Sequence, residues 1–292
     1  MTDGLDFLDR PINIKFYMEI TILGSGTGIP NARRGAPGIL VKIGHDYVLL
    51  DSGPGSLRQL ARVGHSTHDI GWVCYTHLHP DHTIDLVDFL FSAKYEVQPH
   101  PSLTEATLKY IDEGKKSART KPLHLIGPAG FKNFYEGITK LYHESVINHS
   151  YPLIIDEVSL ADLKFPNEHH SFWHLKSIDV LHEEHSVAYR LELPSGKSVV
   201  YSGDTNYCKN IVKIASEADL LILECSFPGN IYLPGHLNSV LAGRVAKEAR
   251  VKKLVLTHLY PVCDDYDLLR EVKSAWPEGD ITIAEDLMQI KI

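Results

Sequence analysis

Four potential metal ligands occur within six residues, shortly after an apolar segment. The apolar segment is Val73–Tyr75, and the ligands that follow it are His77, His79, Asp81 and His82. Residues two apart in an extended chain point to the same side, so His77 and His79 can approach one ion. Pro80 favours an extended backbone at His79 and suits a helix start, which turns Asp81 and His82 away from the first pair. We therefore predict a strand-to-helix turn whose ligands divide between two ions.

A lone histidine is usually an ordinary surface or core residue, and we expect this of most of the 17 histidines in the chain. The group at His77–His82 is different, because imidazoles and a carboxylate gathered at one strand end are costly to bury without partners. Histidine and aspartate are common ligands of zinc and related ions. A metal site is therefore the better interpretation of this segment.

The overall composition is that of an ordinary globular chain, with 43% hydrophobic and 23% charged residues. Acidic residues outnumber basic ones, giving a formal charge of −8, and no long basic run offers a surface for duplex DNA or anionic lipid. Met1–Phe16 lacks the apolar core of a secretory signal, and no apolar stretch is long enough to span a membrane. The four cysteines have no CxxC spacing. We expect a cytoplasmic protein with reduced cysteines and no membrane partner.

Short apolar runs bounded by Gly, Pro or Asp predict buried strands. They are Met18–Leu23, Gly38–Ile43, Tyr47–Leu50, Ile70–Tyr75, Leu123–Ile126, His174–Leu181, Val187–Leu193, Ser198–Tyr201, Leu220–Leu223, Lys253–Leu256 and Ile281–Ile292. Helical periodicity marks Ser56–Val63, His82–Tyr95, Ala129–Tyr142, Lys209–Ala218, Ser239–Arg250 and Tyr266–Trp276. Several strands follow one another without a helix, so a simple doubly wound parallel sheet fits poorly. We predict an α/β fold in which two mixed sheets pack together and are flanked by helices.

The segment Lys94–Lys121 loses apolar periodicity. After Lys94 it carries Lys109, Lys115, Lys116, Arg119 and Lys121. We interpret it as a solvated connection, with a lid bearing a small basic patch as the alternative.

The segment His77–His82 resembles the HxHxDH signature of the metallo-β-lactamase superfamily. Further motifs resemble the ribonuclease Z-like branch of metal-dependent hydrolases in that superfamily. They are two Gly-rich turns at Leu23–Gly28 and Leu50–Gly55, a GDT motif at Tyr201–Thr205, and the last metal-binding strand at Leu254–Leu259. The resemblance implies a four-layer αββα sandwich over residues 18–292, preceded by an N-terminal extension at residues 1–17. The first Gly-rich turn reads GxGxG, which fits neither a dinucleotide fingerprint nor a P-loop.

Carried over residue by residue, the resemblance implies a set of ligands for two metal ions. His77, His79 and a later histidine would bind the first ion, Asp81, His82 and His258 the second, and Asp204 both. In the family, the later histidine precedes a Tyr-Arg pair by seven residues. His182 stands seven residues before Tyr189, whereas His185 stands four before it. We therefore choose His182 and leave His185 as a pocket-lining or loop residue.

Residue chemistry supports Asp204 independently, and Asp51 and His236 are two further candidates. Asp204 follows an apolar strand, and its two oxygens suit a bridge between cations, although capping the next helix is the alternative. Asp51 either orients a ligand histidine or forms a turn. His236 resembles the histidine that ribonuclease Z-like enzymes place over the substrate phosphate, where it can protonate a leaving group; a polar residue near a helix start is the alternative.

The resemblance implies hydrolysis. Two divalent ions about 3.5–4 Å apart can generate a hydroxide near neutral pH, which would bridge them, and Asp81 would hold the attacking water. Zn²⁺ is the first choice for this ligand set, with Mn²⁺ or Fe as alternatives. The most consistent activity is a phosphodiesterase; a hydrolase of carboxylic, lactone or sulfate esters would use the same site. A non-catalytic or flavin-linked member is disfavoured, because the ligand set is complete and no added domain is evident.

The expected substrate is a small or short single-stranded phosphodiester. Family members that process tRNA carry a long basic arm between the third ligand histidine and the GDT motif, but only 22 positions separate His182 from Asp204. Each lysine or arginine of such an arm would add affinity for RNA through counterion release. tRNA is therefore a disfavoured partner, and a tRNA 3′-processing endoribonuclease is the second alternative. The sequence is also compatible with a homodimer.

Overall fold

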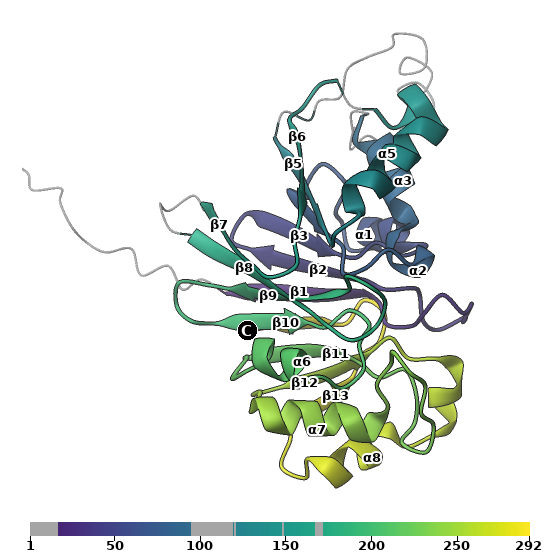
Figure 1. The fold of residues 1–292 in the computed structure, drawn as a ribbon, viewed down its shortest axis with the longest axis vertical. Helices are drawn as coiled ribbons and strands as arrows, with labels where there is room; N and C mark the ends of the chain where they lie inside the picture. Colours follow the sequence, from purple (N-terminus) through teal and green to yellow (C-terminus); the bar gives the residue numbers. More distant parts are fainter. Residues whose placement is uncertain (1–16, 95–118, 120, 148, 167–171) are drawn as a thin grey trace, which may run out of the picture.

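The computed structural model describes residues 17–94, 119, 121–147, 149–166 and 172–292 (Figure 1). In this part of the chain, two seven-stranded β-sheets pack against each other. The first sheet has the order β14-β1-β2-β3-β4-β5-β6. Its strands are β1 (Met18–Gly24), β2 (Gly38–Ile43), β3 (Asp46–Leu50), β4 (Trp72–Cys74), β5 (Leu123–Gly127), β6 (Leu153–Glu157) and β14 (Gln289–Lys291).

The second sheet has the order β13-β12-β11-β10-β9-β8-β7. Its strands are β7 (Ala161–Pro166), β8 (Phe172–Asp179), β9 (Val187–Glu192), β10 (Ser198–Tyr201), β11 (Leu220–Glu224), β12 (Leu254–Thr257) and β13 (Ile281–Ile283). In each sheet the antiparallel pairs lie toward one edge and the parallel pairs toward the other. Both sheets are therefore mixed, as predicted.

Helices cover the outer faces of both sheets (Figure 1). On the first sheet they are α1 (Ser56–Arg62), α2 (Pro80–Thr83), α3 (Asp85–Ala93) and α5 (Phe131–Tyr142). On the second sheet they are α6 (Lys209–Ile214), α7 (Ser239–Ala249) and α8 (Leu268–Ala275). Two short 3-10 helices also occur in the described part of the chain, one directly after α5 at His143–Ser145 and one before α8 at Pro261–Asp265. The layers are helix, sheet, sheet and helix, which confirms the predicted αββα sandwich. No helix among the described residues is both long and apolar enough to cross a membrane.

The two-residue period of the strands builds the core. In β2, Ile39, Val41 and Ile43 face the space between the two sheets, where they join residues of the second sheet in one buried cluster. Leu40, between them, points to the opposite face and packs with the helices outside the first sheet. Both faces of the sheet are thus buried, which explains why the strands read as apolar runs rather than as clean alternation.

Most predicted strands are confirmed, but Ile281–Ile292 is wrong as a single strand. Its two ends form β13 and β14, which belong to different sheets. Asp286 lies between them and accepts hydrogen bonds from the backbone N–H groups of Ser25 (2.9 Å) and Gly35 (2.8 Å). This carboxylate fixes the point at which the chain crosses from the second sheet to the first.

Two helices differ from the prediction. The predicted helix from His82 is divided into α2 and α3, and Tyr95 lies outside the described residues. Helix α6 ends at Ile214, four residues earlier than predicted. The Arg190 guanidinium, on β9, donates hydrogen bonds to the carbonyl oxygens of Ile214 (3.1 Å) and Ser216 (2.8 Å). These carbonyl groups therefore bind β9 instead of continuing the helical hydrogen bonds.

Most of the predicted connection Lys94–Lys121 lies outside the described residues, including Lys109, Lys115 and Lys116. Arg119 is described, and it contradicts the basic-patch alternative at that position, because its side chain is buried. Its guanidinium donates hydrogen bonds to the carbonyl oxygens of Thr67 (3.0 Å) and Ile70 (2.8 Å). Arg119 therefore stabilises the loop before β4.

Candidate metal centre

The candidate metal centre lies where several strands end. The segment after β4 carries the HxHxDH residues, Asp204 follows β10, and His258 follows β12. His79 has an extended backbone (φ −64°, ψ 148°) and Pro80 opens α2, which confirms the predicted strand-to-helix turn. Because β10, β11 and β12 run parallel, their carboxyl ends meet at one edge of the second sheet, opposite the turn after β4.

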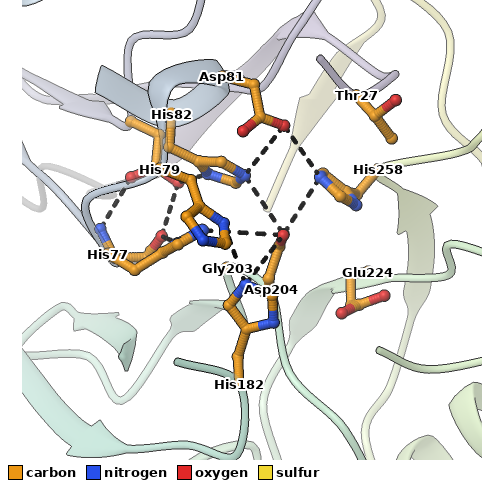
Figure 2. Close-up of polar contacts among 12 residues, drawn as sticks. Thr27, His77, His79, Asp81, His82, His182, Gly203, Asp204, Glu224 and His258 are labelled. Carbon is orange, nitrogen blue, oxygen red and sulfur yellow. Dashed lines mark hydrogen bonds and ion pairs between the residues drawn. The ribbon is translucent and has the colours of Figure 1, made fainter. Parts of the chain in front are cut away.

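The structure brings together all seven predicted ligands (Figure 2). In the first group, His77, His79, His182 and Asp204 each offer one ligand atom, and these atoms lie within 4.8 Å of one another. Nε2 of His182 lies 3.3 Å from Nδ1 of His79 and 3.7 Å from Oδ2 of Asp204. Nε2 of His77 lies 3.8 Å from the same Asp204 oxygen.

The second group contains Asp81, His82 and His258, again within 4.8 Å of one another. Oδ1 of Asp204 lies 3.3 Å from Nε2 of His82 and 3.3 Å from Nε2 of His258. Oδ2 of Asp81 lies 3.6 Å from Nε2 of His258. Asp204 thus turns one oxygen toward each group, which is the geometry that a bridging carboxylate requires.

Several buried polar atoms of this cluster fit metal ions. Nε2 of His77, His82 and His258 and Oδ1 of Asp204 are buried and find no hydrogen-bond partner among the described residues. Buried polar atoms in folded proteins are normally paired, so a set that faces one space points to a missing partner. Imidazole nitrogens and carboxylate oxygens are the donors that zinc and similar divalent ions accept.

The protonation of the cluster agrees with this fit. Burial lowers the pKa of His77 and also that of His182, so both rings are neutral and offer a lone pair. Burial opposes ionisation of Asp204, but His258 and His82 outweigh it and hold its pKa well below the usual range. The first group therefore combines the neutral rings of His77 and His182 with an ionised carboxylate at Asp204.

Hydrogen bonds on the far side of the rings orient the imidazoles. Nδ1 of His82 lies 2.7 Å from the Asp51 carboxylate, and Nδ1 of His182 lies 2.9 Å from the Gly235 carbonyl oxygen. Each contact leaves Nε2 facing the cluster. The interpretation of Asp51 as a residue that orients a histidine is therefore confirmed.

The two Gly-rich turns pass close to the centre. The backbone N–H of Gly28 donates a hydrogen bond of 3.0 Å to Oδ2 of Asp81. A Cβ atom at Gly53 would lie 1.9 Å from the carbonyl oxygen of Asp81, so only glycine fits at this position. Both turns therefore pack directly against the candidate ligand Asp81.

His236 lies at the margin of the cluster, where its ring stacks on that of His258 with a centroid separation of 5.7 Å. Its Nδ1 lies 3.0 Å from Oε1 of Glu224, the last residue of β11. Burial opposes a charge on His236, but the Glu224 carboxylate outweighs it and raises the pKa of the imidazole.

Sequence reasoning missed two residues and left one open. Glu224 and Ser226 are buried in this network, and the available signal was a carboxylate directly after the apolar run Leu220–Leu223. The undecided residue, His185, has an exposed side chain whose Nε2 lies 3.5 Å from Glu184. His185 does not belong to either group of candidate ligands.

Comparisons with known proteins agree with the fold. Residues 147–259 match the beta-lactamase superfamily domain, and residues 18–112 match the family described as anti-Pycsar protein Apyc1. The chain is 26% identical to the ribonuclease Z of Streptomyces avermitilis over 322 aligned positions, covering 94% of this chain and 97% of the relative.

Solved structures share the architecture. The metallo-β-lactamase fold protein YhfI from Bacillus subtilis superposes with a TM-score of 0.71 at 24% identity, covering 94% of this chain and all of that chain. The short form of human tRNase Z gives a TM-score of 0.68 at 23% identity, covering 93% and 98%. The chain thus has the metallo-β-lactamase fold of these structures, matches the beta-lactamase superfamily domain over residues 147–259, and is similar to ribonuclease Z along nearly its whole length.

Proposed function

We propose that the chain is a dinuclear phosphodiesterase that acts on small or short single-stranded phosphodiesters. One ion would be held by His77, His79 and His182, and the other by Asp81, His82 and His258, with Asp204 shared between them. The observation that carries this proposal is the division of the Asp204 carboxylate, with Oδ1 3.3 Å from His82 and His258 and Oδ2 3.7 Å from His182.

Two divalent ions bound here would supply Lewis acidity and activate water near neutral pH. The protein would orient the attacking water through Asp81. The Gly28 N–H fixes Oδ2 of this carboxylate at 3.0 Å, and burial is offset by His258 and His82, which keep the pKa of Asp81 low. Asp81 is therefore a hydrogen-bond acceptor at working pH.

His236 would donate the proton that the leaving oxygen requires. Its Nδ1–H is engaged by Glu224, which leaves Nε2 as the ring atom for a substrate. The raised pKa keeps a larger fraction of the imidazole protonated near neutral pH, which suits a general acid.

The preference for small substrates is supported by the chain between His182 and Asp204. Every residue there is described, and β9 and β10 form one antiparallel hairpin with a short turn at residues 193–197. No arm extends from this segment. The ribonuclease Z alignment spans 322 positions, more than the 292 residues of this chain, so that relative has residues that this chain lacks.

Four further assignments belong to this proposal. Zn²⁺ is the metal that the histidine-rich ligand set favours, with Mn²⁺ or Fe as alternatives. Residues 1–17 would form an extension outside the catalytic domain at 18–292. A cytoplasmic location and a homodimer are compatible with the composition, and neither is needed for the chemistry.

The test is metal analysis combined with a substrate panel. The purified chain is assayed for bound metal and then with bis-p-nitrophenyl phosphate, a cyclic nucleotide, an aryl carboxylic ester and a pre-tRNA. We expect metal to be present and the small phosphodiesters to be hydrolysed. Hydrolysis of the carboxylic ester alone would contradict the phosphodiesterase assignment, and a strong preference for pre-tRNA would contradict only the substrate size.

A further inference from the structure

The Ser226 hydroxyl lies between the metal centre and the His236–Glu224 pair. Its Oγ is 2.7 Å from Oε2 of Glu224, 3.0 Å from Nδ1 of His258 and 3.2 Å from Nδ1 of His236. Ser226 is completely buried, so water does not compete for these contacts. One hydroxyl therefore connects a candidate metal ligand with the candidate proton donor.

Donor and acceptor roles determine where the protons lie. The Glu224 carboxylate accepts hydrogen bonds from the backbone N–H groups of Thr205 (2.7 Å, to Oε1) and Leu237 (3.1 Å, to Oε2), so both of its oxygens act as acceptors. Ser226 must therefore donate its hydroxyl proton to Glu224. A hydroxyl has only one proton, so toward His258 the Ser226 oxygen acts as the acceptor.

The consequence for His258 is a fixed tautomer. Its Nδ1 must carry the proton that Ser226 accepts, and its Nε2 is left with a free lone pair. That Nε2 faces Oδ1 of Asp204 at 3.3 Å and Oδ2 of Asp81 at 3.6 Å, which is the place of the second ion.

We propose that Ser226 is a positioning residue that holds His258 in the tautomer able to bind the second ion. Asp51 supports His82 directly with a carboxylate, whereas Glu224 supports His258 through the Ser226 hydroxyl. The same carboxylate also fixes Nδ1 of His236, so Glu224 sets the orientation of both rings. This inference rests on the proposed function, because it requires an ion bound by Asp81, His82 and His258.

The test titrates Zn²⁺ into the metal-free chain by calorimetry, with Co²⁺ absorption spectra as an independent readout. Loss of an outer hydrogen-bond partner typically weakens metal binding about 10–100-fold, and we expect this loss for the second ion in Ser226→Ala, while the first ion binds as in the wild type. Ser226→Thr keeps the hydroxyl and should bind the second ion as the wild type does. Ser198→Ala is the matched control, because Ser198 is a buried serine whose hydroxyl has no hydrogen-bond partner among the described residues.

The outcomes separate the two proposals. If Ser226→Ala binds two ions with wild-type affinity and spectrum, the role of Ser226 is wrong, although the phosphodiesterase assignment stands. If the wild-type chain binds fewer than two ions, the proposed function itself fails. Should Ser226→Ala not fold, Ser226→Val and Ser226→Thr provide a pair of nearly equal shape, and equal binding of the second ion by both would overturn the inference.

Discussion

The Asp51 carboxylate lies 2.7 Å from Nδ1 of His82, and both side chains are completely buried. Asp51 also accepts hydrogen bonds from the Thr76 N–H (2.8 Å) and from the Tyr201 hydroxyl (2.9 Å). A single carboxylate thus ties β3, the turn after β4, and β10 to one histidine of the metal centre.

Asp51→Ala should reduce both metal binding and stability. It leaves His82 without its partner, and we expect metal affinity to fall about 10–100-fold. It also leaves buried donors unpaired, at a cost of about 1–3 kcal/mol each in the free energy of unfolding. Urea denaturation of the metal-free protein measures the second effect separately from the first. Asp51→Asn retains an acceptor and should lose less stability; equal stability of the alanine variant and the wild type would contradict this role.

The His182 and His185 variants test the choice of ligand. His182→Ala removes a ring whose Nε2 is 3.7 Å from Asp204, so bound metal and activity should both fall. His185→Ala removes an exposed ring outside the cluster and should keep wild-type metal content. Metal content is measured by elemental analysis after gel filtration. The reverse pattern would move the ligand to His185.

His236→Ala tests the proton donor through the leaving group. Loss of a general acid typically costs about 10²–10⁴-fold when the leaving oxygen needs a proton, and far less when it leaves readily as an anion. We therefore expect a large loss of kcat/KM for a diester with an alkyl alcohol as leaving group and a small loss for bis-p-nitrophenyl phosphate. Losses of equal size for both substrates would contradict the assignment.

The pH profile supplies a second readout of His236. Because the active form is the protonated imidazole, kcat/KM for the alkyl diester should fall as pH rises through the pKa of His236. Glu224 raises that pKa, so the fall should begin above the ordinary value for histidine, about 6.5. The fall of kcat/KM with rising pH should be small for the p-nitrophenyl diester, because that leaving group does not need the proton.

Asp219 is predicted to stabilise the second sheet in a pH-dependent way. Its buried carboxylate lies 3.0 Å from Nζ of Lys197 and 2.9 Å from Nζ of Lys252. Burial opposes ionisation, but the two lysines outweigh it and lower the pKa of Asp219. The stabilisation is therefore present above the unfolded pKa of about 3.9 and is lost as pH falls through the lower folded value.

We expect Asp219→Asn to lower the free energy of unfolding by about 1.5–3 kcal/mol near neutral pH, the range for hydrogen bonds to charged groups. Guanidinium denaturation at neutral pH and again well below the unfolded pKa measures the change. The deficit should shrink in acid. Asp280→Asn is the control, because Asp280 forms an exposed pair with Lys253 and such pairs contribute about 1 kcal/mol or less. A pH-independent deficit would rule out the charge as its cause.

Local spacing made much of the site predictable. The order His-x-His-Pro-Asp-His places a proline between a strand end and a helix start, so the backbone geometry of this turn could be predicted. The position of Asp204 at the edge of a sheet could be predicted because it follows an apolar strand. The hydrogen bonds of Ser226 and Glu224 were not predictable, because they depend on which strands become neighbours in the second sheet. The strands β6 and β7 were missed because they are half-exposed and lack a continuous apolar run.

The most direct test of the central claim is a Zn²⁺ titration of the metal-free chain, in which bound ions and hydrolysis of bis-p-nitrophenyl phosphate are measured on the same samples. The two groups of candidate ligands, with the Asp204 carboxylate between them, predict that two ions bind per chain and that full activity requires the second. Saturation at one ion per chain, or full activity in the metal-free protein, would contradict the dinuclear centre.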